Sequence, residues 1–73
     1  MSLMTQAYFL EKYGPRLDVA QLARELGIAP KTVLNQVSAK AFPIPTYLDQ
    51  GKRWADFRDV AAYFDACRAA ASL

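Results

Sequence analysis

Residues 18–30 read DVAQLARELGIAP, and this stretch decides the fold. The Asp18 carboxylate can cap the backbone amide of Gln21 while the Gln21 side chain reaches back, which is how a capped helix begins. Apolar residues then recur on one helical face, and Gly27 supplies the left-handed conformation that ends a helix. Pro30 follows closely, and proline suits the first position of a new helix because no N–H is needed there. The stretch therefore predicts two helices joined by a short turn.

The second of these helices is expected over about residues 30–39. Its predicted buried face consists of Val33, Leu34 and Val37. In the first helix, Ala23 precedes Gly27 by one turn, and its small side chain lets the two helices pack closely. Two helices joined in this way form a helix-turn-helix, in which the first helix supports the second. A helical hairpin with no role on DNA is the alternative interpretation.

A short β-hairpin is expected after this unit. Residues 42–45 read FPIP, which cannot continue a helix and predicts a stiff extended segment. Two strand-like runs follow at residues 46–48 and 52–54, separated by Asp49-Gln50-Gly51 with the glycine where a positive φ is expected. A hairpin that follows a helix-turn-helix is a wing, and here it spans residues 46–54.

Two further helices are expected at the ends of the chain. The first spans residues 5–13 and stops at Gly14-Pro15, and the last begins at Asp56 as its N-cap. The apolar face of the last helix is predicted to comprise Val60, Tyr63, Phe64 and Cys67, with Cys67 buried. The aromatic residues expected either to form a dimer surface or to complete the core are Tyr8, Phe9 and Tyr13. Those expected to anchor the hairpin on the core are Trp54 and Phe57.

Length and composition predict one folded domain. The chain has 73 residues, of which 53% are apolar, with only three glycines and four prolines. We interpret residues 1–3 as a cloning remnant and residues 4–73 as a single, mainly α-helical domain with the small hairpin. With no histidine and one cysteine, the usual general bases, thiol–imidazole pairs and metal-ligand sets cannot be assembled. We therefore expect no enzyme activity, no catalytic residue, no metal and no cofactor.

The distribution of charge indicates the kind of partner. Residues 31–53 carry Lys31, Lys40, Lys52 and Arg53 against Asp49 alone, a net of +3, whereas the whole chain carries +2. A local excess of positive charge suits nucleic acid because neutralising phosphates releases counterions. An ordinary solvated face with lysines is the alternative. The sequence has no apolar run long enough to span a membrane and no signal-peptide pattern, and a single cysteine suits a reducing compartment, so a cytoplasmic protein is expected.

The motifs LDV (17–19), GIAPKTV (27–33), FPIP (42–45), GKRW (51–54) and DVAAY (59–63) occur in this order. The chain thereby resembles the small winged helix-turn-helix proteins of the AlpA, excisionase and MerR-like group, including the pyocin-activator type, over about residues 16–66. The resemblance implies a bacterial, nucleoid-associated protein that binds double-stranded DNA and regulates transcription for a phage, plasmid or integrated element. The alternative that the resemblance leaves open is an excisionase-type recombination directionality factor that bends DNA beside an integrase. Ala29 departs from the group's usual serine or threonine, and Gln36 from a commonly apolar position.

In a helix-turn-helix, the N-terminal part of the second helix enters the major groove and contacts base edges. A carboxamide can form two hydrogen bonds to adenine, and threonine can offer its methyl group to thymine or its hydroxyl group to either base. The expected base contacts are therefore Thr32, Asn35 and Gln36. The expected contacts to the DNA backbone are Lys31, Lys40, Lys52 and Arg53, the last two reaching the backbone or minor groove from the wing. Pairing of Arg53 with Asp56 is the alternative, and Arg16 and Arg24 are further candidates for flanking phosphates.

A single recognition helix offers few contacts, so self-association on DNA is expected, as a dimer or a cooperative array. An integrase or RNA polymerase is a further candidate partner. The competing hypothesis is a protein–protein adaptor that does not bind DNA. The low net charge of the chain supports this hypothesis. So does the net charge of −1 over residues 54–73, where Arg58 and Arg68 face Asp56, Asp59 and Asp65 in the count.

Overall fold

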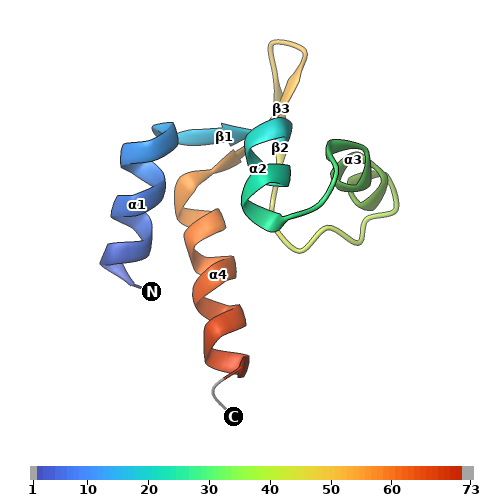
Figure 1. The fold of residues 1–73 in the computed structure, drawn as a ribbon. Helices are drawn as coiled ribbons and strands as arrows, with labels where there is room; N and C mark the ends of the chain where they lie inside the picture. Colours follow the sequence, from blue (N-terminus) through green and yellow to red (C-terminus); the bar gives the residue numbers. More distant parts are fainter. Residues whose placement is uncertain (1, 72–73) are drawn as a thin grey trace.

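The computed structural model describes residues 2–71 and gives this part of the chain four helices and a three-stranded antiparallel sheet (Figure 1). The elements in order are α1 (Leu3–Tyr13), β1 (Arg16–Asp18), α2 (Val19–Leu26), α3 (Pro30–Ser38), β2 (Tyr47–Asp49), β3 (Lys52–Asp56) and α4 (Phe57–Ala71). This small, mainly helical domain is compatible with a winged helical fold. No helix within residues 2–71 is long and apolar enough to cross a membrane.

The predicted pair of helices and the turn between them are confirmed. Asp18 Oδ1 accepts a hydrogen bond from the Gln21 amide at 2.9 Å, and Gln21 Oε1 accepts one from the Asp18 amide at 3.0 Å. Gly27 ends α2 in the left-handed conformation with φ 72°. Pro30 opens α3, and Ala29 before it makes no side-chain capping bond. Local capping chemistry therefore sets both ends of the turn.

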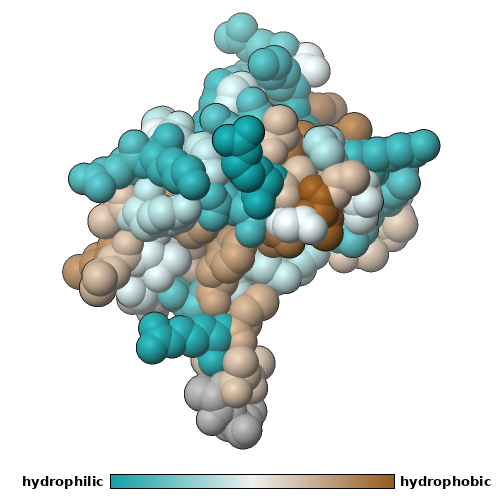
Figure 2. All heavy atoms as spheres, in the orientation of Figure 1, coloured by the Kyte–Doolittle hydropathy of each residue, from teal (hydrophilic) through white to brown (hydrophobic). Residues whose placement is uncertain are grey.

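The predicted hairpin is also confirmed, with slightly shifted bounds. Asp49 pairs with Lys52, so the loop consists of Gln50 and Gly51, whose φ values are 52° and 79°. Two left-handed residues in a two-residue loop are the pattern of a type I′ turn, which matches the twist of the strands. The hairpin rises from the body of the domain in Figure 1, and hydrophilic side chains cover its tip in Figure 2.

The sequence did not predict strand β1, which pairs with β3 so that the sheet order is β1-β3-β2. Leu17 lies opposite Ala55 in this pairing, and both side chains are fully buried. Asp18 is both the last residue of the strand and the N-cap of α2. The third strand thus fixes the hairpin to the start of the helix pair.

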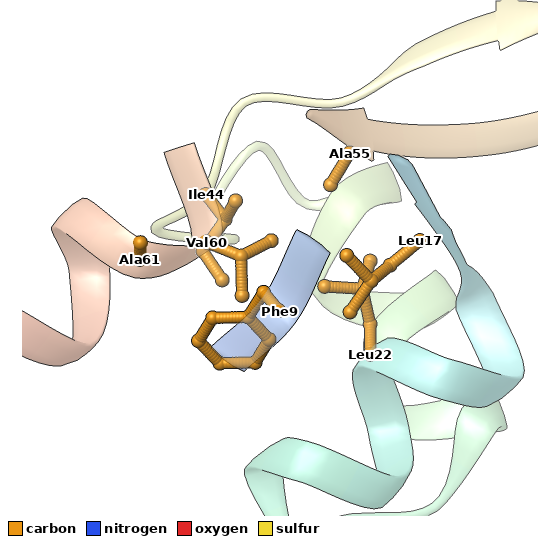
Figure 3. Packing of buried hydrophobic residues seen from close by; sticks show 7 residues of the cluster. All are labelled: Phe9, Leu17, Leu22, Ile44, Ala55, Val60 and Ala61. Atoms are coloured by element: carbon orange, nitrogen blue, oxygen red, sulfur yellow. The ribbon is translucent and has the colours of Figure 1, made fainter. Parts of the chain in front are cut away.

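The core lies between α1, α2, α4 and the sheet. Its buried residues are Phe9, Leu17, Leu22, Ile44, Ala55, Val60 and Ala61 (Figure 3). Phe9 is 2% exposed and its ring centroid lies 5.5 Å from that of Phe64, so of the two alternatives for this residue the structure supports completion of the core. Ile44 comes from the segment between α3 and β2 and anchors that connection in the core.

Helix α1 begins earlier than the predicted residue 5 because its N-terminal end is bonded to α4. Asp65 accepts hydrogen bonds from the Ser2 amide at 2.8 Å and from Thr5 Oγ1 at 2.9 Å. Helix α4 continues beyond this contact and projects past the end of α1 (Figure 1). Cys67 lies on this projecting part and is exposed, so the prediction that it is buried is wrong.

Candidate nucleic-acid interface

Helix α3 presents one face to solvent, and the residues exposed there are Lys31, Leu34, Asn35 and Ser38. Val33 is fully buried against the body of the domain. Asn35, one of the three predicted base contacts, lies on the exposed face, whereas Thr32 and Gln36 are half-buried on its flank. Because residues three and four positions apart share a helix face, the three predicted base contacts lie along one flank of α3, with Asn35 exposed and Thr32 and Gln36 half-buried.

The prediction that Leu34 belongs to the core is wrong, because this side chain is 47% exposed. Successive residues of an α-helix are turned by about 100°, so a surface that buries Val33 must extend about a quarter of a turn around the helix to bury Leu34 as well. Within residues 2–71, α3 packs chiefly on α2, so its outer side stays open.

The end of α3 is closed by a Schellman motif with lysine in the glycine position. The Ala41 amide donates to the Gln36 carbonyl at 2.8 Å, and the Lys40 amide donates to the Val37 carbonyl at 3.0 Å. Lys40 has φ 58°, which a residue with a Cβ adopts at some cost. Its side chain is exposed, so Lys31 and Lys40 place a positive charge at each end of α3.

Lys52 and Arg53 belong to opposite faces of the hairpin because they are neighbours in one strand. Arg53 lies opposite Leu48, on the same face as buried Ala55, and its Nη1 donates to Thr46 Oγ1 at 2.8 Å. The alternative pairing of Arg53 with Asp56 is wrong. The Asp56 carboxylate instead binds Arg58 Nε at 3.0 Å, and this guanidinium lowers the pKa of Asp56.

The other face of the sheet carries an internal clamp formed by Arg16, Asp49 and Trp54. The Arg16 Cζ lies 3.8 Å from the centroid of the Trp54 ring, and its Nη1 lies 2.7 Å from Asp49 Oδ2. The Trp54 Nε1 donates to the Asp49 carbonyl at 3.3 Å. Arg16 therefore acts within the domain, which removes the basis for its expected contact to a flanking phosphate.

This clamp changes the electrostatics of the surface. Asp49 is the only carboxylate between residues 26 and 55, and the guanidinium of Arg16 neutralises it. The cations Lys31, Lys40 and Lys52 are exposed, and none takes part in an ion pair within the described residues 2–71. Lys52 does lie 5.9 Å from the Trp54 ring centroid. The side of the domain formed by α3 and the hairpin thus carries uncompensated positive charge.

A shallow hollow lies between the hairpin and the start of α2. Its lining consists of Asp18, Val19, Ala20, Lys52 and Arg53, so it runs from the start of α2 to the first residues of β3. In Figure 2 hydrophilic side chains extend from the hairpin tip at the top and from the α3 side at the right, with apolar atoms between them. The residues that line the hollow thus bring Lys52 and Arg53 of the hairpin close to Asp18 at the start of α2.

Among residues 2–71, no group of three or more Asp, Glu or Cys side chains is placed to hold a metal ion. Three comparisons add no relative: neither a family model, nor a curated protein, nor a solved structure matches the chain. The interpretation of the surface therefore rests on its own residues.

Proposed function

We propose that this chain is a sequence-specific double-stranded DNA-binding protein that regulates transcription for a phage, plasmid or integrated element. In this proposal α3 enters the major groove, and the β2–β3 hairpin lies on the DNA backbone or in the minor groove. The observation that carries it is the outer face of α3, where Asn35 is flanked by lysine and no carboxylate lies on the helix. A polyanion with hydrogen-bonding base edges complements such a face.

The hairpin supports the same proposal. Lys52 stands exposed near its tip, and Arg53 lies on the face of the sheet that the helices cover, beside the hollow at the start of α2. A DNA backbone passing along this hollow would meet Lys52 and Arg53 while α3 occupies the adjacent groove. Phosphate contacts of this kind position a protein on DNA, and base contacts from α3 supply the sequence preference.

Self-association on DNA is part of the proposal. One short recognition helix reads only a few base pairs, which is too few for a unique site in a genome. Two or more copies on adjacent sites would supply the missing specificity. Analytical ultracentrifugation of the protein with its selected duplex should then give a complex with more than one copy per duplex.

The test is fluorescence anisotropy with a labelled duplex of random sequence, repeated from low to moderate salt. We expect affinity to fall steeply with salt concentration. The joint variant Lys52→Ala with Arg53→Ala should weaken binding to every duplex and reduce the salt slope, the slope of log affinity against log salt concentration, by about two. Arg68→Ala is the matched control, since it removes an exposed cation from the far part of α4. The control should bind like the wild type. Absence of duplex binding even at low salt would refute the proposal and favour the adaptor hypothesis.

Asn35→Ala tests the role of α3 separately. A residue that contacts base edges without touching phosphate should change sequence preference while leaving the salt slope nearly unchanged. Site selection from a random duplex library, performed with the wild type and with the variant, measures this preference. We expect the variant to tolerate other bases at one position per half-site, at which the wild type selects adenine.

A further inference from the structure

Leu34 stands out among the exposed residues of α3. It is 47% exposed, whereas the amide-bearing Gln36 on the same helix is half-buried. Within residues 2–71 the other large apolar side chains of comparable exposure lie on α1 and β2, so Leu34 is the one that α3 presents. Leu34 is an apolar side chain in the middle of a polar, cationic face. A partner that offers an apolar group in polar surroundings could bury it and so remove its apolar surface from water.

The neighbours of Leu34 define that partner further. Residues three and four positions apart share a helix face, so Lys31 and Ser38 flank Leu34 along the axis, and Asn35 lies beside it. The chain has no acidic residue from position 26 to position 48. The floor of the major groove matches this pattern, because thymine carries a C5-methyl group among the hydrogen-bonding edges of the bases.

We infer that Leu34 is a specificity-determining residue that packs on the C5-methyl group of a pyrimidine in the major groove, next to the base that Asn35 contacts. This inference rests on the proposed function. Along the helix axis Leu34 lies about 4.5 Å from Lys31 and about 1.5 Å from Asn35. This spacing places the side chains of Leu34 and Asn35 over neighbouring base pairs. Thymine is the natural source of such a methyl group.

The experiment uses the full chain and the duplex obtained by site selection. Each thymine is replaced in turn by deoxyuridine, which keeps every hydrogen-bonding group and removes only the C5-methyl. We expect one substitution per half-site to weaken wild-type binding about fourfold, the effect of one buried methyl-sized group. At that position Leu34→Ala should bind the thymine and uracil duplexes equally, with an unchanged salt slope.

Two variants make the result specific. Leu34→Met keeps an apolar side chain of similar volume and should retain part of the preference for thymine over uracil. Asn35→Ala should retain that preference in full while relaxing the adjacent position. Circular dichroism and thermal unfolding confirm that the variants fold, which is expected because Leu34 is exposed and alanine favours helix.

The outcomes separate this inference from the proposed function. Duplex binding that is insensitive to uracil at every thymine overturns the role of Leu34 and leaves the DNA-binding proposal standing. The same holds if Leu34→Ala keeps the wild-type preference for thymine, since another residue would then contact the methyl group. Failure of the wild type to bind any duplex overturns the proposed function itself.

Discussion

The guanidinium of Arg16 stacks on the ring of Trp54, with its Cζ 3.8 Å from the ring centroid. Arg16 lies on β1 and also binds Asp49 on β2, so its side chain joins the two outer strands of the sheet across the central strand that carries Trp54. One side chain therefore does two things. It holds the hairpin against the domain, and its positive charge compensates the carboxylate of Asp49, which lies opposite Lys52.

The first prediction separates these two effects. Arg16→Ala should lower the melting temperature and weaken duplex binding several-fold, because it frees the Asp49 carboxylate at the proposed interface. Adding Asp49→Ala to Arg16→Ala should restore much of the binding but not the stability, since the stacking on Trp54 stays lost. Anisotropy titrations and thermal unfolding measure the two quantities. Equal binding by the single and double variants would show that the charge of Asp49 does not matter.

The second prediction concerns Lys40, which occupies a position that glycine usually fills. With φ 58°, the lysine backbone carries strain that Lys40→Gly relieves, so we expect the free energy of unfolding to rise by about 0.5–1 kcal/mol. Urea denaturation measures this change. The same variant should bind DNA more weakly, with a salt slope smaller by about one, because it loses one proposed phosphate contact.

A matched variant tests the cause of this gain in stability. Asparagine tolerates the left-handed conformation better than lysine but less well than glycine, so Lys40→Asn should give an intermediate stability. Both variants remove the same charge and should therefore lose similar DNA affinity. A lower stability of Lys40→Gly than of the wild type would contradict the argument from strain.

The third prediction concerns the tip of the hairpin. Gln50 is left-handed in a type I′ turn, where asparagine followed by glycine is preferred, so Gln50→Asn should stabilise the domain by about 0.5 kcal/mol. Gly51→Ala should destabilise it by about 1 kcal/mol. No atom lies within 4 Å of the position a Cβ would take at Gly51, so this loss comes from φ 79° rather than from a clash. Thermal unfolding of both variants measures the effects.

Much of the fold follows from signals that act over a few residues. The capping box at Asp18, the left-handed Gly27 and the proline at position 30 define α2 and α3 without reference to the remainder of the chain. The turn at Gln50 and Gly51 defines the hairpin in the same way, although glycine alone was expected to be left-handed. These features were predictable because each depends on the backbone chemistry of adjacent residues.

The features that escaped prediction depend on distant parts of the chain. Strand β1 has only three residues and exists because β3 offers it a partner. Whether Leu34 is buried or exposed depends on how α2 packs against Val33. The spacing of Val33 and Val37 within α3 is compatible with either outcome. Cys67 shares the periodicity of the core residues on α4, but it is exposed because no other element within the described residues covers its side of the helix there. The outward position of Lys31, Asn35 and Lys40 was therefore predictable from the sequence, whereas the exposure of Leu34 was not.

The last prediction concerns acid stability and Glu25, the residue that ties α2 to α1. Its carboxylate accepts hydrogen bonds from Tyr8 Oη at 3.1 Å, from Lys12 Nζ at 3.1 Å and from Tyr13 Oη. Burial alone would raise the pKa of Glu25, but these three hydrogen bonds outweigh it and lower the pKa below 4.5. A lowered pKa in the folded state gives stability that is present above pH 4.5 and is lost as the pH falls through the folded value.

Glu25→Gln should therefore be less stable than the wild type at neutral pH, and the difference should shrink as the pH falls below 4.5. Asp56 and Asp65 also have lowered pKa values, so the wild type loses stability in the same range from several groups. The difference between the wild type and Glu25→Gln removes these shared contributions. Glu11→Gln, an exposed carboxylate on α1, is the matched control and should follow the wild type throughout. A difference that stays constant from pH 7 to pH 3 would mean that the charge of Glu25 does not hold α1 against α2.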